Sequence, residues 1–443
     1  MLLNIGIDDT DSEVFGCTTH VAAKIVSQLD GMKGVQFIDY PLLVRLNPNI
    51  PWKTRGNGAV SIRIRVESRE VYEEVACSVV SIVEKLSDLS SPRSEPAIVF
   101  SNKLPQKGDM LHQFYLRVLR SMVSPVEALK IAEETGVSCR FLKTSKVGVV
   151  GALAAVGAVF DDYTFELLSY RTRENYGKPR RVDRDSVILM DELTSKNTFN
   201  NIDPETKRIL ITPHGRDPVL FGIRGETPEA VYNAFRLVKA EEEIECWCIF
   251  KTNQGTDSHF PEEPVAISQV KKYDSTLVEG RVVDKKIIRG GHVIVSIEGG
   301  GRISCAFYSP TGGLKKAASM LEPGDHVRVY GGVKEHSGKL VVNAEKMEVL
   351  KLCEKTRRIP PACPKCGRKC KSLGLRQGFA CEECGETVEE PQTIVMERGL
   401  TVNHPYLPPE RSHRHLTKPL KRYGFEKNRL NETYGFIIPW HYP

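Results

Sequence analysis

The spacing of apolar and polar positions predicts short strands alternating with amphipathic helices over residues 1–142. Short apolar runs are typical of strands, and apolar positions that recur at helical spacing are typical of helices. The predicted strands are Leu2–Ile7, Leu42–Leu46, Ala59–Val66 and Ala97–Phe100, and the predicted helices are Thr19–Leu29, Arg69–Leu86, Leu111–Leu119 and Pro125–Thr135. We therefore interpret residues 1–142 as an α/β domain.

Residues 143–268 have a different order of elements. The pattern predicts strands at Ile209–Thr212, Val219–Arg224 and Cys246–Lys251, with a helix at Pro228–Val238 before the last strand. Thr227 before Pro228 supports this helix start, because Thr is a good N-cap and Pro suits the first helical position. We expect an α+β domain of the ferredoxin-like type. The most apolar segment, Val147–Phe160, is interrupted by glycines, and we expect it to be buried protein structure rather than a membrane span.

Residues 272–351 change to strands with alternating apolar and polar positions, separated by glycine-rich turns. The predicted strands are Thr276–Val283, His292–Ile297, Ile303–Tyr308, His326–Tyr330 and Leu340–Val342, with one helix, Leu314–Leu321, after the third strand. This is the order of an OB-fold β-barrel. Such barrels bind single-stranded nucleic acid, and the alternative is a barrel that serves only as a spacer.

Residues 356–392 contain a cysteine module. Cys363 with Cys366, and Cys381 with Cys384, form two C-x-x-C-G knuckles. Each knuckle turns both thiolates toward one centre, so the pair supplies the four ligands of a tetrahedral structural zinc ion. Because all four ligands are cysteine, no position is open for a catalytic water. We predict a small zinc ribbon. Its basic residues around Phe379 are either solvated or in contact with nucleic acid, and the neighbouring barrel and basic tail favour contact with RNA or single-stranded DNA.

Composition narrows the class of protein without naming an activity. The 443 residues carry a net charge of +6, which does not by itself indicate a nucleic-acid binder. In the C-terminal tail, residues 393–443, seven basic residues lie between Arg411 and Arg429, and such a run is either a solvated tail or a phosphate-contacting arm. We expect no membrane span and no signal peptide. The cysteine usage fits a reducing compartment, so we expect a cytoplasmic protein.

Asp8, Asp9 and Asp11 directly follow the first predicted strand, and the turn 16–19 leads from them into the first predicted helix. Carboxylates this close repel one another unless a cation or hydrogen-bond donors lie among them. The ordinary alternative is an aspartate-rich turn. A strand, an acidic loop and a helix N-terminus in this order also suit a metal and a nucleotide phosphate. We interpret the segment as an active-site loop.

A second candidate loop, Arg45–Ala59, combines prolines, glycines and cations. Lys53 and Arg55 supply donors for phosphate oxygens, and the glycines before and after Asn57 allow close backbone approach to a ligand. Together with the acidic loop, these residues form the two halves of a phosphoryl-transfer site in which carboxylates hold Mg²⁺. The chain has no Walker-type phosphate loop. Spacing alone therefore favours an ATP-using enzyme without naming its acceptor.

Six motifs together resemble one known family. They are IGIDDTDS, GCTTH, RLNPNIPWKTRGNGAVS, GALAAVGA, FGIRGET and CPKCGRKC. Over nearly the whole chain, and in the same domain order, the sequence resembles the archaeal tRNA 2-agmatinylcytidine synthetases, also called tRNA-isoleucine agmatidine synthetases. The first two motifs together are specific, whereas the barrel and the ribbon are generic.

The resemblance implies an ATP-dependent tRNA-modifying ligase. Members of this family replace the C2 oxygen of the wobble cytidine of the minor isoleucine tRNA, which has a CAU anticodon, with agmatine. They first phosphorylate that oxygen, release AMP and two phosphates from ATP, and switch decoding from AUG to AUA. By resemblance, the N-terminal domain is a kinase-like catalytic domain, the ferredoxin-like domain binds agmatine, and the barrel and ribbon bind the tRNA.

The resemblance also assigns residues. The family's ATP and Mg²⁺ loop corresponds to Asp8, Asp9 and Asp11, and its autophosphorylated threonine to Thr18, for which a plain helix cap is the alternative. Agmatine is a dication, so its pocket requires carboxylates or carbonyl oxygens. The candidates in the second domain are Asp161, Asp162, Glu166, Asp203 and Glu226.

Two other functions are open on sequence grounds. One is a non-catalytic adaptor for single-stranded nucleic acid, built on the barrel and the ribbon. The other is an RNA-linked kinase with a different acceptor. The acidic loop argues against the adaptor, because an adaptor has no use for three clustered carboxylates that face a basic loop. The sequence leaves the oligomeric state open.

Overall fold

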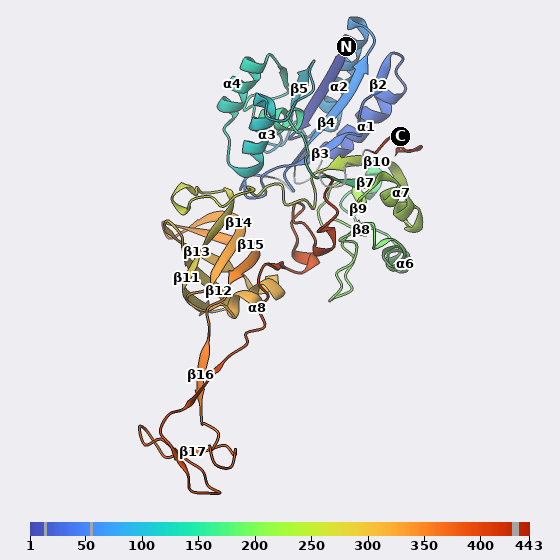
Figure 1. Ribbon diagram of the computed structural model, residues 1–443. Coiled ribbons are helices and arrows are strands. Elements are labelled where there is room, and N and C mark those ends of the chain that lie inside the picture. Colours follow the sequence, from blue (N-terminus) through green and yellow to red (C-terminus); the bar gives the residue numbers. More distant parts are fainter. Residues whose placement is uncertain (13–15, 54–55, 428–433) are drawn as a thin grey trace.

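The computed structural model describes residues 1–12, 16–53, 56–427 and 434–443. A large open sheet covered by helices forms one lobe, and a barrel packs beside it (Figure 1). A thin two-stranded stalk carries the cysteine module away from the barrel. No helix in the described ranges is long and apolar enough to cross a membrane.

The N-terminal half of the sheet has the strand order β6-β5-β1-β4-β3, with β2 paired to β4. Its strands are β1 (Leu2–Asp8), β2 (Val35–Phe37), β3 (Leu42–Arg45), β4 (Gly58–Val66), β5 (Ala97–Ser101) and β6 (Ser138–Phe141). Its helices are α1 (Thr18–Asp30), α2 (Arg69–Leu86), α3 (Met110–Arg120), α4 (Pro125–Thr135) and α5 (Val149–Val156). These strands pair antiparallel with one another. The predicted strands and helices are all present, whereas β2 and β6 were not predicted.

Strand β1 is covered on both faces. Leu3, Ile5 and Ile7 belong to the apolar core that contains α1 and α2. On the other face α5 crosses so closely that a Cβ on Gly6 would lie 2.1 Å from the carbonyl oxygen of Ala152. The buried apolar segment expected around residues 147–160 is therefore confirmed as α5, and it supports the strand that ends at the acidic loop.

The ferredoxin-like half continues the same sheet in the order β10-β7-β9-β8. Its elements are β7 (Thr164–Arg171), α6 (Arg184–Thr194), β8 (Thr198–Phe199), β9 (Val219–Gly225), α7 (Pro228–Leu237) and β10 (Ile244–Thr252). This β-α-β-β-α-β order, with the last strand beside the first, is the ferredoxin-like arrangement, as predicted. The run β1-α1-β3-β4-α2-β5 has the same spatial order, so the lobe contains two units of one topology. The sequence showed no such repeat.

Strands β3 and β10 pair in parallel and join the two halves into one sheet, with Leu42 opposite Lys251. The strand predicted at Ile209–Thr212 is wrong. In this segment a single isolated bridge joins Ile202 and Ile209. Its apolar residues are part of a loop, and they line the cavity described below instead of pairing in the sheet.

The barrel prediction is confirmed. Its strands follow the order β13-β12-β11-β14-β15, and β13 pairs with β15 to close the barrel. The elements are β11 (Ser275–Ile288), β12 (His292–Glu298), β13 (Arg302–Phe307), α8 (Gly313–Ser319), β14 (His326–His336) and β15 (Lys339–Lys351). β15 is longer than the predicted Leu340–Val342. The prediction stopped at the charged residues of this strand, which are buried in ion pairs. Lys346 Nζ lies 2.8 Å from Asp257, and Glu345 lies 3.5 Å from His259.

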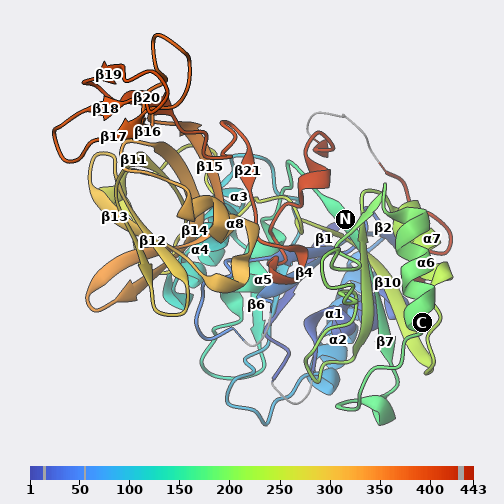
Figure 2. The ribbon, with the colours of Figure 1, turned by 90° about the horizontal axis from the view of Figure 1, so that it is seen from below.

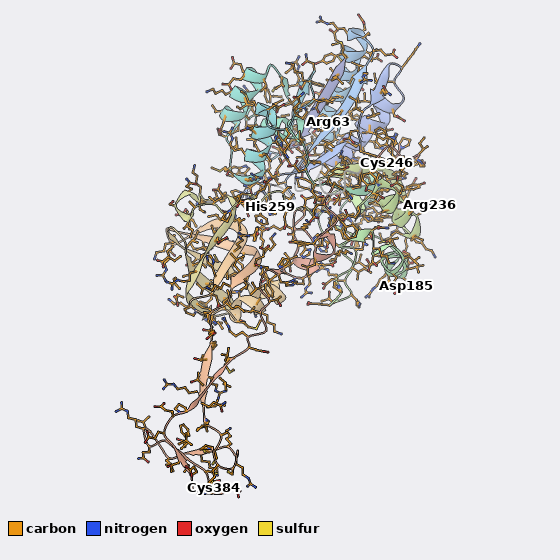
Figure 3. The ribbon with its side chains drawn as sticks, viewed as in Figure 1. Arg63, Asp185, Arg236, Cys246, His259 and Cys384 are labelled. Carbon is orange, nitrogen blue, oxygen red and sulfur yellow. The ribbon has the colours of Figure 1, made fainter. Side chains whose placement is uncertain are left out.

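Beyond the barrel, β16 (Thr356–Ile359) pairs with β20 (Gln392–Val395) to form the stalk. The ribbon at its end holds β17 (Lys371–Ser372), β18 (Phe379–Ala380) and β19 (Thr387–Val388), and Figure 3 shows Cys384 at this far end. The chain then returns to the body of the molecule (Figure 2). β21 (Pro405–Tyr406) pairs with β15, and β22 (His441–Tyr442) pairs with β10. The basic run from Arg411 is therefore not a solvated tail as far as the structure describes it, to Lys427, because Lys418, Arg422 and Lys427 are buried.

Candidate active site

The acidic loop begins where β1 leaves the sheet. Asp8 is the last residue of β1, and Asp9 follows in the left-handed backbone region with a φ of 60°. Burial, and then the charge of Asp9, raises the pKa of Asp8 well above its ordinary value. Burial, and then the charge of Asp11, raises the pKa of Asp9 to about 7. Burial and mutual repulsion therefore disfavour the ionised forms of Asp8 and Asp9, and a bound cation would relieve this repulsion.

Helix α5 packs against this loop through Gly151, the first glycine of the GALAAVGA motif. A Cβ on Gly151 would lie 1.8 Å from Asp8 Oδ2, and a Cβ on Gly148 would lie 3.1 Å from the Cβ of Asp9. Any side chain at position 151 would therefore displace the Asp8 carboxylate. The absence of these side chains lets the helix and the acidic loop pack together.

Thr18 is the first residue of α1, and Cys17 is its N-cap. The Thr18 hydroxyl lies 3.1 Å from the hydroxyl of Thr10, and both side chains are buried. Thr18 therefore does not cap the helix, and the alternative interpretation of this residue is wrong. Its hydroxyl stands at a helix N-terminus, where free backbone N–H groups attract anions.

One large cavity of about 1470 Å³ connects the acidic loop with the ferredoxin-like half. Its walls come from the acidic loop, the basic loop, the segment 210–219 and the C-terminal segment 410–416. The sequence-predicted site residues that line it are Asp8, Asp9, Asp11, Thr18, Lys53, Asn57 and Glu166. Arg55 lies outside the described residues.

Three cations gather at the basic loop. Burial, followed by the charges of Arg414 and Lys334, lowers the pKa of Lys53. Lys334 Nζ donates to the backbone oxygen of Asn49 at 3.2 Å, which places the barrel directly against this loop. Cations whose charges lower the pKa of Lys53 in this way favour the binding of an anion such as a phosphate.

Asparagine side chains hold the basic loop in place. Asn57 Nδ2 donates to the backbone oxygen of Asn47 at 2.7 Å. Asn47 in turn donates to the backbone oxygen of Tyr273 at 2.8 Å, and Asn49 Nδ2 donates to Ser275 Oγ at 2.9 Å. Asn57 therefore shapes the loop in addition to lining the cavity, and the loop is fastened to the barrel.

Glu166 is the acidic centre of the opposite wall and is only 1 % exposed. Arg224 Nε donates to Glu166 Oε1 at 3.0 Å, and Gln254 Nε2 donates to Glu166 Oε2. Arg45, from the basic loop, lies 3.7 Å from the same carboxylate. Glu166 therefore connects the two halves of the cavity.

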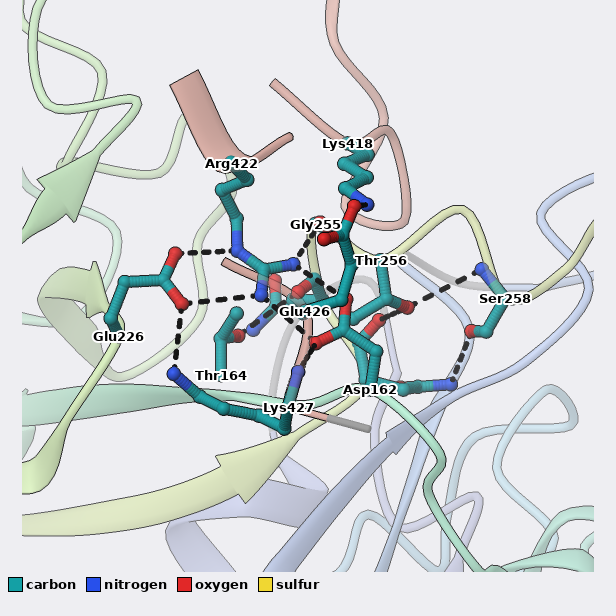
Figure 4. Close-up of polar contacts among 12 residues, drawn as sticks. Asp162, Thr164, Glu226, Gly255, Thr256, Ser258, Lys418, Arg422, Glu426 and Lys427 are labelled. Carbon is teal, nitrogen blue, oxygen red and sulfur yellow. Dashed lines mark hydrogen bonds and ion pairs between the residues drawn. The ribbon is translucent and has the colours of Figure 1, made fainter. Parts of the chain in front are cut away.

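The other four agmatine candidates do not line the cavity and pair with cations of the chain. Lys107 contacts Asp161 at 2.6 Å, and Arg411 contacts Asp203 at 2.8 Å. Arg422 lies between the remaining two, with Nη2 3.1 Å from Asp162 and Nε 2.6 Å from Glu226 (Figure 4). Lys427 also contacts Glu226, at 3.2 Å. Much of the C-terminal basic run is thus consumed in internal ion pairs.

The four knuckle cysteines converge as predicted. Their sulfur atoms all lie within 4.8 Å of one another, and the Cys363–Cys384 and Cys366–Cys381 pairs are each 3.4 Å apart. A tetrahedral zinc ion with Zn–S bonds of about 2.3 Å requires sulfur separations of roughly 3.8 Å, so the group fits zinc. Cys370 is buried beside the group but is not a member of it.

Sequence reasoning missed two cavity residues, Arg224 and His415, and their buried neighbour Gln254. Arg224 lies within the FGIRGET motif, which supported the family resemblance but did not indicate what Arg224 does. Gln254 has no sequence signal, because a single glutamine after a strand is ordinary. His415 lies within the C-terminal basic run, where a count of charges overlooked the histidine.

Models of known domains match the chain in four consecutive parts. They are a TiaS TCKD domain at residues 4–144, a TiaS FLD domain at 146–259, an OB-fold nucleic acid binding domain at 276–350 and a TiaS C-terminal zinc ribbon domain at 360–400.

Curated relatives and solved structures agree with these matches. The chain is 41% identical over 425 residues to TiaS of Pyrococcus horikoshii, a 2-agmatinylcytidine synthetase of isoleucine tRNA, covering 95% of this chain and 97% of the relative. It is similar to the crystal structure of a complex of TiaS with isoleucine tRNA and ATP, with a TM-score of 0.81, 34% identity, and coverage of 95% of this chain and 97% of the other. A complex of TiaS with isoleucine tRNA, AMPCPP and agmatine gives a TM-score of 0.79 at 32% identity, with the same coverage. The chain therefore belongs to the TiaS family of isoleucine-tRNA 2-agmatinylcytidine synthetases.

Proposed function

We propose that this protein ligates agmatine to C2 of the wobble cytidine of the minor isoleucine tRNA in an ATP-dependent reaction. The observation that carries the proposal is a single cavity that holds the acidic loop and Thr18 at one end and Glu166 at the other. Phosphoryl transfer and attack by an amine on the same base require both ends to reach one another. The structures of relatives with isoleucine tRNA, with ATP, and with an ATP analogue and agmatine support this assignment.

In this proposal Asp8, Asp9 and Asp11 hold Mg²⁺, which neutralises phosphate charge when it is bound. The raised pKa values of Asp8 and Asp9 support the assignment, because a divalent cation relieves their mutual repulsion. Thr18 accepts a phosphoryl group at the start of α1. Lys53, Arg55 and Asn57 belong to the ATP side, where the cations gathered at the basic loop contact phosphates.

On the amine side we propose Glu166 as the acid that attracts agmatine. Of the five candidates it is the one that lines the cavity, whereas Asp161, Asp162, Asp203 and Glu226 do not line it. Arg224 and Arg45 pair with Glu166 in this structure, so bound agmatine would replace one of these contacts. We further propose that the division into residues 1–142, 143–268, 272–351, 356–392 and 393–443 describes functional parts, with tRNA bound by barrel and ribbon. A cytoplasmic location follows from this substrate.

The test is direct. Purified protein is incubated with ATP, agmatine and an isoleucine tRNA transcript with a CAU anticodon, and the nucleosides are analysed by mass. The proposal requires an agmatine-modified cytidine, with Cys77→Ser as an active control, since Cys77 is exposed and distant from the knuckles. An active protein that phosphorylates the RNA without incorporating agmatine would support the RNA-linked kinase instead. Binding without any ATP turnover would support the adaptor.

A further inference from the structure

The chain that returns from the zinc ribbon places a histidine in the cavity. His415 lines the cavity together with residues 413, 414 and 416. Its ring approaches the basic loop so closely that a Cβ on Gly56 would lie 2.7 Å from His415 Nε2. The imidazole therefore stands between the basic loop and the ferredoxin-like wall.

A chain of hydrogen bonds fixes which ring nitrogen carries the proton. The carboxylate of Glu166 only accepts, so the Gln254 group that contacts it is the amide N–H, and Gln254 Oε1 is left as an acceptor. His415 Nδ1 lies 2.9 Å from this Oε1 and therefore donates to it. Arg224 Nη2 also approaches Nδ1, but at 3.4 Å this contact is longer, and the shorter contact to Gln254 decides the tautomer. The lone pair of the neutral ring is consequently on Nε2, which faces Gly56.

The surroundings keep this ring neutral. Burial, followed by the charges of Arg45 and Arg224, lowers the pKa of His415 well below its usual range. Within the described residues, Nε2 has no hydrogen-bond partner. The cavity thus contains a neutral, directed acceptor next to two guanidinium groups that can only donate.

Agmatine is a ligand that supplies donors at both ends, a guanidinium and an amine. An amine that attacks carbon needs its own lone pair aimed at that carbon. Acceptance of one of its N–H groups by a fixed acceptor sets that direction.

We propose that His415 is a substrate-binding residue of the ligation step, whose Nε2 accepts a hydrogen bond from the attacking amine of agmatine, after its ammonium proton is lost to solvent, and orients the amine lone pair toward C2 of the cytidine. The new C2–N bond forms as the C2–O bond to the phosphate breaks, and one amine proton leaves with the released phosphate. Gln254 and Glu166 act as positioning residues that hold the ring in the required tautomer. This inference rests on the proposed function, and it makes the C-terminal segment part of the small-molecule site.

The experiment measures phosphorylation and agmatine incorporation separately in the variant His415→Phe. Phenylalanine keeps a flat ring but removes the hydrogen-bond acceptor. We expect the rates of phosphorylation of Thr18 and of the tRNA to stay within about threefold of those of the unaltered protein. We expect agmatine incorporation to fall about 10- to 100-fold, with accumulation of phosphorylated tRNA. His415→Gln, which can return an acceptor near Nε2, should restore part of the incorporation.

Gly56→Ala provides a second variant, because its Cβ would lie 2.7 Å from the His415 ring and would push it away while leaving His415 in the sequence. It should lose agmatine incorporation at least as strongly as His415→Phe, and its phosphorylation steps are measured separately because the same Cβ would lie 2.8 Å from Arg45 Nη1. His404→Phe is the matched control, since His404 is exposed and does not line the cavity, and it should behave as the unaltered protein. Unchanged agmatine incorporation by His415→Phe, or an equal loss of both phosphorylation steps, would overturn the inference. Absence of the modified cytidine with the unaltered protein would instead overturn the proposed function.

Discussion

Asp9→Asn should stabilise the metal-free protein at neutral and alkaline pH while it abolishes ATP-dependent chemistry. Asparagine has the shape of aspartate and tolerates the left-handed backbone at this position, where φ is 60°. The substitution therefore removes the charge with little change in conformation. The acidic loop loses one of the carboxylates that burial and mutual repulsion make unfavourable.

The magnitude follows from the raised pKa. The pKa of Asp9 rises from an ordinary 3.8 to about 7, and each pKa unit corresponds to about 1.4 kcal/mol. For an acid with a raised pKa, the contribution to stability is fully present below pH 3.8 and is lost as the pH rises through 7. The unaltered protein thus loses up to ~4 kcal/mol between these limits, and about half of that after allowance for solvent contact and for the neighbouring carboxyls. The variant is spared this loss.

The assay is thermal unfolding of both proteins without added metal at pH 5 and pH 8. At pH 8 the variant should melt a few degrees higher, whereas the difference should shrink at pH 5. Addition of Mg²⁺ and ATP should raise the melting temperature of the unaltered protein and leave the variant unchanged, because ligand that binds only the folded state stabilises it. A variant that melts lower at pH 8, or that keeps the full pH dependence, would refute the reasoning.

Three further predictions follow from the site and its supports. Gly151→Ala should displace the Asp8 carboxylate and reduce Thr18 phosphorylation about 100-fold in a folded protein; normal phosphorylation would show that the contact is tolerated. Cys363→Ser should lose zinc by elemental analysis and weaken tRNA binding, while Thr18 phosphorylation and the Cys77→Ser control stay intact; zinc retention would exclude the four-cysteine site. Arg422→Met should lower the free energy of unfolding by about 3–5 kcal/mol, because it leaves buried Asp162 and Glu226 underneutralised; an unchanged denaturation midpoint would contradict this.

Local patterns predicted the features whose partners are close in sequence. The knuckle cysteines, the strand before Asp8 and the alternation in the barrel each carry their signal within a few residues. Strand β7 was missed because Glu166 and Arg171 interrupt its apolar run, although both are buried in ion pairs.

Features held by distant partners could not be predicted. Arg422 contacts Asp162 across 260 positions, so a charge run in the tail could not be told from a solvated one. For the same reason the sequence could not show that four of the agmatine candidates pair with cations of the chain away from the cavity, and the position of His415 beside Gln254 had no local signature. Only the tertiary fold decides which charges are already neutralised.

The parallel contact between β3 and β10 has a consequence for how the reaction must be staged. This pairing places the strands of Asp8 and Glu166, β1 and β7, in one continuous sheet. Four strand spacings of about 4.8 Å each, or roughly 19 Å across the sheet, separate these two strands. A closing motion of one half against the other would break the pairing of Leu42 with Lys251 and of Leu43 with Thr252. In the proposed reaction the two ends of the cavity are therefore connected by movement of the wobble base rather than by movement of the two halves.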